Sequence, residues 1–164
     1  MTPLYWMLLF LAMFASALFS GIEIAFVSAN RLKIELDKNR GELTAKLLSN
    51  FLKQPAKFIG AMLLGNNVAL VIYSIIMAKL LEPQIVAHIV SNELAVLLIQ
   101  TILSTIVVLV FAEFLPKTLF RINPNKVLSI AAIPLVVVYY MLLPFTYFTV
   151  GVSNLILKLF NVDT

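Results

Sequence analysis

Four stretches of the sequence are almost entirely apolar, at about residues 4–29, 58–81, 94–115 and 127–151. A helix of about 20 apolar residues crosses the hydrocarbon core of a bilayer, so each stretch is long enough to form a membrane-spanning helix. The chain of 164 residues is 62% hydrophobic and only 12% charged, which is more apolar than a soluble domain of this size requires. The sequence therefore predicts an all-α integral membrane protein.

Most of the basic residues lie in one segment between the first two apolar stretches. This segment contains Arg31, Lys33, Lys38, Arg40, Lys46, Lys53 and Lys57. By the positive-inside rule the segment is cytoplasmic, and the N-terminus, which carries no basic side chain, is expected outside. The net charge of +4 is therefore explained by membrane topology, and we expect no nucleic-acid partner.

The basic segment also has a helical pattern, because leucine and phenylalanine recur at helical spacing among its charges. Gly41 divides the pattern into two short amphipathic helices, and Gln54-Pro55 ends the second. We expect these helices, at about 31–54, to lie on the inner membrane face or beneath the bundle.

The fourth apolar stretch is predicted not to cross the membrane. Basic residues flank it on both sides, with Lys117, Arg121 and Lys126 before it and Lys158 after it. Both flanks therefore favour the cytoplasm, and Pro134 and Pro144 divide the stretch into pieces shorter than a bilayer. We predict three complete spans, formed by the first three stretches, and a bent juxtamembrane belt helix at about 127–151. The C-terminus is then cytoplasmic.

Each of the three predicted spans contains polar residues. They are Ser20, Gly21 and Glu23 in the first, Gly65, Asn66 and Asn67 in the second, and Glu113 in the third, followed by Pro116 and Lys117. A charged side chain at a helix centre costs about 3 kcal/mol on insertion scales, so such residues usually have a partner or a function. At roughly 1.5 Å per residue, Ser20 and Asn66 both lie about 13 Å from the cytoplasmic ends of their spans. Glu113 is near the inner end of the third span.

All of these candidate ligands are oxygen atoms, from a hydroxyl, carboxylates, amides and the backbone carbonyls near Gly21, Gly65 and Pro116. The chain has no cysteine and a single histidine, His88, which argues against zinc or copper. Hard cations such as Mg²⁺, Mn²⁺, Ca²⁺ or Na⁺ remain.

Two other interpretations of the polar residues are available. They could serve assembly, with Glu113 paired to Lys117 one helical turn away. They could also form an enzyme site, but neither a nucleophile–base pair nor a metal–histidine motif accompanies the carboxylates, so we do not predict an enzyme.

Four motifs, in this order and at these intervals, resemble the membrane domain of the CorC/CNNM (cyclin M-like) magnesium transporters. They are Ser20-Gly21-Ile22-Glu23-Ile24-Ala25, Arg31-Leu32, Gly65-Asn66-Asn67 and Ala112-Glu113-Phe114-Leu115-Pro116-Lys117. The resemblance covers essentially the whole chain. It implies three spans, a belt helix, a homodimer in the plasma (inner) membrane, and export of Mg²⁺ by alternating access, with Na⁺ as the candidate exchanged ion. It also implies a cytosolic pair of CBS modules downstream of these residues, which bind ATP in relatives.

The resemblance also implies roles for single residues. It assigns the Mg²⁺ ligands to Ser20, to Asn66 or Asn67, and to Glu113, with help from backbone oxygens around Gly21 and Gly65. Glu23 is either a ligand or a charge near a coupled cation such as Na⁺. Lys117 orients Glu113 or screens it when the ion leaves. The alternative, of a different class, is a membrane scaffold or Mg²⁺-sensing regulator that transports nothing.

Overall fold

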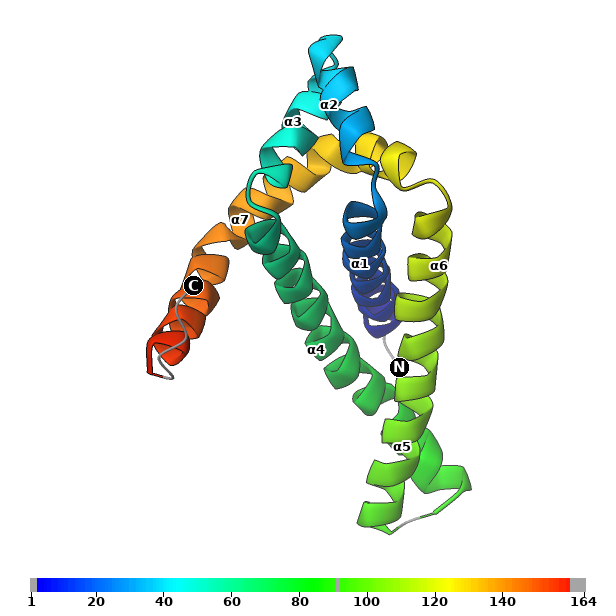
Figure 1. Cartoon of the computed structure of the whole chain (residues 1–164). Helices are drawn as coiled ribbons and strands as arrows, with labels where there is room; N and C mark the ends of the chain where they lie inside the picture. Colours follow the sequence, from blue (N-terminus) through cyan, green and yellow to red (C-terminus); the bar gives the residue numbers. More distant parts are fainter. Residues whose placement is uncertain (1–2, 91, 160–164) are drawn as a thin grey trace.

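The computed structural model describes residues 3–90 and 92–159, without the side chains of 149–150 and 153–159. Within these residues all regular structure is helical, which confirms the all-α prediction. The elements, shown in Figure 1, are α1 (Pro3–Ser28), α2 (Arg31–Asn39), α3 (Leu43–Leu52), α4 (Pro55–His88), α5 (Glu93–Val108), the π-helix η1 (Leu109–Phe114), α6 (Leu115–Ile122) and α7 (Pro124–Leu159).

By length and composition, four helical segments could cross a membrane, so the predicted count of three is wrong on this measure. They are Pro3–Ser28, Pro55–His88, Glu93–Ile122, which runs through α5, η1 and α6, and Pro124–Phe148. The difference lies in the fourth, because Pro134 and Pro144 are inside α7 and do not end it. Both prolines are exposed, and each removes only one backbone hydrogen bond. The opposite face of α7 is buried against the bundle, which sustains the helix through them.

Helices α1 and α4 form a closely packed antiparallel pair. Small residues recur every fourth position on one face of α1, at Ala12, Ser16 and Ser20, and all three are buried. Small side chains let two helix backbones approach each other closely. On α4, Gly65 makes the same approach possible, because a Cβ atom there would lie 2.7 Å from the Phe19 ring of α1.

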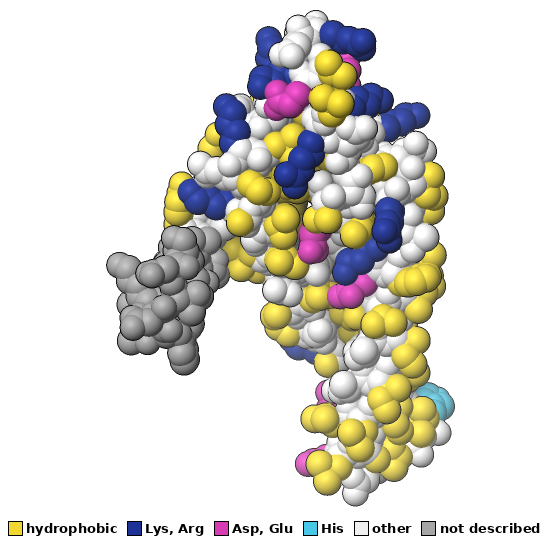
Figure 2. Space-filling model, viewed as in Figure 1, with side chains coloured by type: hydrophobic (Ala, Val, Ile, Leu, Met, Phe, Trp, Pro, Cys, Tyr) yellow, Lys and Arg dark blue, Asp and Glu magenta, His cyan; other side chains and the backbone are white. Residues whose placement is uncertain are grey.

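One end of the molecule, here called the basic end, is formed by α2, α3 and the beginnings of α4 and α7. Figure 2 shows lysine and arginine side chains gathered over it. The two short helices predicted for this segment are present. Asn30 caps α2 by accepting the backbone N–H of Lys33 at 3.1 Å, and Gly41 separates α2 from α3 with a φ of 93°, a backbone conformation that favours glycine.

The first part of α7 is attached to the basic end by polar contacts. The Asn125 side chain accepts the backbone N–H of Asn30 at 2.9 Å and donates to the Asn30 carbonyl at 3.1 Å. One turn later, the Ser129 and Thr44 hydroxyls are 3.2 Å apart. These contacts hold α7 against the end of α1 and the start of α3.

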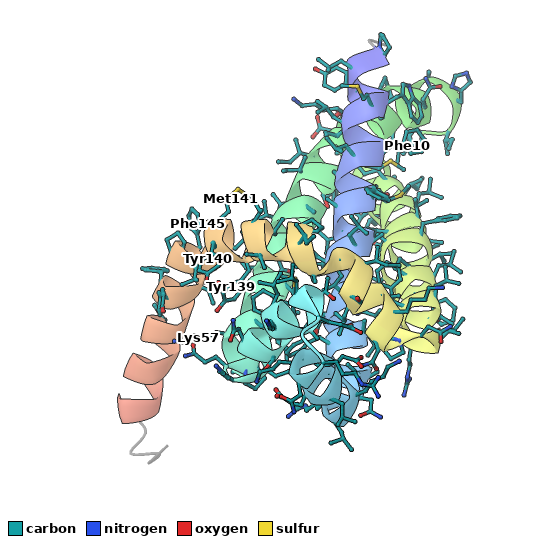
Figure 3. All side chains as sticks on the ribbon, turned by 90° about the horizontal axis from the view of Figure 1, so that it is seen from above. Phe10, Lys57, Tyr139, Tyr140, Met141 and Phe145 are labelled. Carbon is teal, nitrogen blue, oxygen red and sulfur yellow. The ribbon has the colours of Figure 1, made fainter. Side chains whose placement is uncertain are left out.

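The middle of α7 stays at the same end, where it packs on aromatic rings. The Tyr139 ring lies 5.0 Å from the Phe51 ring and 6.0 Å from the Phe58 ring. Further along, the Lys57 Nζ atom lies 4.8 Å from the centre of the Tyr147 ring. Figure 3 shows α7 passing across the bundle, with Tyr139 and Lys57 labelled beside it. From Asn125 to Tyr147, therefore, these contacts join α7 to the basic ends of α1, α3 and α4.

Candidate ion site

A buried hydrogen bond joins α1 and α4. The Ser16 hydroxyl donates to the Asn66 amide oxygen at 2.6 Å, and the two residues are 0% and 7% exposed. A buried amide is unfavourable unless it is hydrogen-bonded, and Ser16 supplies a partner for its carbonyl. We did not predict Ser16 at the site, although its position four residues before Ser20 places both on one helix face.

Ser20, one turn further along the same face, is in a different situation. It is 0% exposed, and its hydroxyl oxygen has no hydrogen-bond partner among the described residues. Buried polar groups are nearly always satisfied, and leaving one without a partner costs about 1–3 kcal/mol. Its oxygen therefore has unused hydrogen-bonding capacity at the contact of α1 with the helices packed on it.

The structure corrects the predicted level of Ser20 relative to Asn66. Asn66 lies opposite Ser16, so Ser20 is one helical turn, about 6 Å, closer to the basic end. The reason is that α4 begins at Pro55, three residues before the predicted start of the second span. Asn66 is therefore about 4–5 Å farther from that end than the sequence indicated.

The two neighbouring asparagines face different surroundings. Asn66 is buried and Asn67 is exposed, because consecutive residues point about 100° apart around a helix. Of the two, only Asn66 lies in the contact between α1 and α4.

Aromatic rings lie close to both glycines of the predicted site. Gly65 packs on Phe19, as described above, and a Cβ atom on Gly21 would overlap the Phe120 ring of α6. In this structure the glycines therefore allow close packing of α1 with α4 and with α6. Whether their carbonyls bind an ion stays a prediction.

Glu113 lies in the last turn of η1, an element that we did not predict. A π-helix is a widened turn that is found frequently at functional sites. Here it leads into Pro116, whose ring in a regular α-helix clashes with the carbonyl of residue 112. The wider turn accommodates the proline, and the backbone N–H of Leu115 instead bonds to the Val110 carbonyl.

The predicted pairing of Glu113 with Lys117 is present, with the Lys117 Nζ atom 3.9 Å from a carboxylate oxygen. The distance is long and both side chains are partly exposed, at 33% for Glu113 and 43% for Lys117. Such partly solvated pairs contribute little to stability. The carboxylate can therefore exchange this partner for another cation at small cost.

The level of Glu113 follows from the packing of α6 on α1. The two helices run in the same direction (Figure 1), and Phe120 contacts Gly21. Along the helix axis, Glu113 lies seven residues before Phe120, about 10 Å farther from the basic end. Ser16 lies five residues before Gly21, about 7 Å farther from that end. Glu113, Ser16 and Asn66 therefore lie within about one helical turn of a common level.

Glu23 lies apart from this group. It is seven residues beyond Ser16, about 10 Å nearer to the basic end, and it is partly buried. Within the described residues no group of three or more His, Cys, Asp or Glu side chains could hold a metal ion. An ion at the level of Ser16 would therefore be bound by hydroxyl, amide and water oxygens with one carboxylate.

Comparison with known proteins identifies relatives over nearly the whole chain. A family profile described as the cyclin M transmembrane N-terminal domain (CNNM) matches residues 6–164. The UPF0053 inner membrane protein YfjD of Escherichia coli strain K12 is 28% identical over 149 residues, covering 91% of this chain and 33% of that protein. UPF0053 protein MG146 of Mycoplasma genitalium is 28% identical over 88% of this chain and 33% of its own length. The protein Rv1841c of Mycobacterium tuberculosis is 28% identical over 91% of this chain and 44% of its own length. The chain thus spans less than half of the length of these relatives.

Proposed function

The chain belongs to the cyclin M (CNNM) transmembrane domain family, which is associated with Mg²⁺ and ion transport, and on that premise we propose that it transports Mg²⁺ across the inner membrane. The observation that carries the proposal is the unpartnered hydroxyl of Ser20, buried one turn from the Ser16–Asn66 hydrogen bond. In a purely structural contact between α1 and α4, the great majority of buried polar atoms would have a hydrogen-bond partner.

The oxygen atoms at this place suit a hard cation. Mg²⁺ prefers six oxygen ligands and gives up its waters reluctantly. The Asn66 carbonyl has a second lone pair beyond the one that Ser16 uses. Ser20, one turn nearer to the basic end, and Glu113 would reach the same ion through waters that Mg²⁺ retains. One carboxylate and several waters would bind the ion weakly enough for release, and Lys117 would pair with Glu113 after the ion has left.

We also infer the finer features of transport from the family. The proposal is export by alternating access in a homodimer, with Na⁺ as the exchanged cation. Glu23, which lies between the Ser16 level and the basic end, is the candidate charge for the coupled ion. ATP would act only through cytosolic CBS modules outside this chain.

The test is Mg²⁺ flux through purified protein in liposomes that contain a Mg²⁺-sensitive dye. We expect Asn66→Ala to abolish flux and the stabilisation of the protein by Mg²⁺. The matched variant Asn67→Ala removes the same side chain from an exposed position, and we expect it to retain both. Equal loss in the two variants would contradict the assignment to Asn66. Parallel assays with Mn²⁺, Ca²⁺ and Na⁺ define the ion.

A scaffold or Mg²⁺-sensing regulator is the second candidate, and the Ser16–Asn66 bond favours it because interhelical hydrogen bonds also serve assembly. Both of these functions require that the wild-type chain gives no Mg²⁺ flux in either orientation in the liposome. Binding of Mg²⁺ without flux would indicate the regulator, and neither binding nor flux would indicate the scaffold.

A further inference from the structure

A groove of about 470 Å³ lies between α1 and the segment formed by η1 and α6. We call it the α1–α6 groove. It is lined by Ile24, Phe114, Lys117, Thr118, Arg121 and Ile122. Lys117 and Arg121 are four residues apart, so they lie on one face of α6. The groove therefore presents two cations beside three apolar side chains.

The two cations of the groove are not equally engaged. Lys117 lies 3.9 Å from Glu113, whereas Arg121 is exposed and forms no ion pair with any residue that the structure describes. The Thr118 hydroxyl is occupied, because it donates to the Phe114 carbonyl at 2.9 Å. Arg121 is thus the free donor, and its planar guanidinium suits bidentate binding of a phosphate.

The groove runs along α6 from near the middle of the bilayer toward the phospholipid headgroups. α1 has 26 residues and is therefore about 39 Å long, whereas the hydrocarbon core is about 30 Å thick. With α1 centred in the bilayer, Ile24 lies about 13 Å from the middle, just inside the hydrocarbon boundary. Phe120 packs on Gly21, which lies about 8 Å from the middle, so Arg121 is at about 10 Å and Lys117 at about 4 Å. The long Arg121 side chain can therefore extend to the level where phosphate groups meet the acyl chains, whereas Lys117 lies deeper.

Apolar residues at both ends of the groove are open to the surroundings. Phe114 is 63% exposed and Ile122 is 67% exposed, so a molecule in the groove contacts hydrocarbon surface as well as charge. A soluble anion would gain nothing from these side chains. A phospholipid would contact charge and apolar surface together, with its phosphate on Arg121 and its chains along the apolar side chains.

We propose that the α1–α6 groove binds an anionic phospholipid, with Arg121 as the anchor of its phosphate. This site is separate from the proposed ion site in its ligand, and its test does not depend on transport. The preference of the protein for spin-labelled phosphatidylglycerol over spin-labelled phosphatidylcholine can be measured by electron paramagnetic resonance in reconstituted membranes.

We expect wild-type protein to prefer phosphatidylglycerol, and Arg121→Gln to reduce that preference by about fivefold, the factor that one basic residue contributes near an anionic surface. Arg121→Lys keeps the charge and is expected to retain most of the preference. The control is Lys126→Gln, which removes the same charge from an exposed residue outside the groove and is expected to change the preference little.

Three outcomes would overturn the proposal. One is the absence of a phosphatidylglycerol preference in wild-type protein, and another is an equal loss in Arg121→Gln and Lys126→Gln, which would indicate a diffuse surface charge. The third is displacement of the labelled lipid by millimolar soluble glycerol phosphate, which would indicate a site for free phosphate esters. Unchanged helical circular dichroism of each variant shows that folding is intact.

Discussion

At the scale of single residues, two serines on one face of α1 have opposite roles. Ser16 satisfies the buried Asn66 amide, whereas the hydroxyl of Ser20 is buried without a partner among the described residues. Both are 0% exposed and both are small, so an alanine fits at either position. The consequences of the two substitutions should differ because one hydroxyl is used by the protein and the other is not.

For Ser20→Ala we expect the protein without Mg²⁺ to be as stable as wild type or more stable, because the substitution removes an unsatisfied group. Stabilisation by Mg²⁺ should be lost. Thermal unfolding in detergent with and without Mg²⁺ measures both effects.

Ser16→Ala is the matched comparison, and it should lower the free energy of unfolding by about 1–3 kcal/mol even without Mg²⁺, because the Asn66 carbonyl loses its partner. A loss of stability in Ser20→Ala as large as in Ser16→Ala would show that the Ser20 hydroxyl has a partner within the protein.

At the scale of elements, the contact of α1 with α6 depends on the absence of a side chain at Gly21. A Cβ atom there would overlap the Phe120 ring. Gly60 on α4 is different, since the nearest atom to an added Cβ, on Thr146, is 3.6 Å away, which is ordinary contact. Both glycines are inside helices, where alanine is intrinsically more favourable.

We therefore expect Gly21→Ala to destabilise the protein by about 1–3 kcal/mol through overpacking. Gly60→Ala should be neutral or stabilise it by up to about 1 kcal/mol. Denaturation in mixed micelles compares the two variants, and a stabilised Gly21→Ala protein would mean that Phe120 moves aside freely.

The pairing of α2 with α3 provides a prediction about pH. Glu35 accepts hydrogen bonds from the Ser49 hydroxyl and from Lys38, and these interactions, the Ser49 bond first, lower the pKa of Glu35 below 4.5. A carboxylate whose pKa is lower in the folded state stabilises it above the unfolded pKa. That contribution is lost as the pH falls through the folded pKa.

Acidification from pH 7 to below about 4.5 should therefore weaken the attachment of α2 to α3. Glu35→Gln should remove this part of the pH dependence and lower stability at pH 7. Glu42→Gln, at an exposed position, is the control and should not remove the part of the dependence that comes from Glu35. Hydrogen exchange of α2 and α3 at the two pH values measures the effect, and identical profiles for Glu35→Gln and wild type would contradict it.

At the scale of the whole molecule, α7 is the element on which topology depends. Its composition would allow a membrane crossing, yet Asn125, Ser129, Tyr139 and Tyr147 all contact the basic ends of other helices. The side chain of Lys158, used in the topology prediction, lies outside the described residues.

We expect reporters fused at Gly41 and after Thr164 to lie on the same side of the membrane, the cytoplasm, because α7 follows the basic end through Tyr147. Reporters on opposite sides would mean that α7 crosses the bilayer. A reporter between α4 and α5, after Asn92, provides the external control.

The sequence by itself determined the helical class, the membrane environment, the two short helices at the basic end and the polar positions within the spans. These features depend on local composition and periodicity, which are readable along the chain. The pairing of Glu113 with Lys117 was also predictable, since it joins residues one turn apart.

Only the tertiary structure decided that Asn66 pairs with Ser16, that Asn67 is exposed, that η1 precedes Pro116 and that Pro134 and Pro144 leave α7 continuous. The register between α1 and α4 depends on where each helix begins and on how Phe19 fits against Gly65. If the predicted register is wrong by one helical turn, every polar residue is assigned the wrong partner. Likewise, the course of α7 follows from contacts with residues 30 to 58, which are distant in sequence. Such contacts leave no periodic pattern in the chain, so they appear only when the helices are packed together.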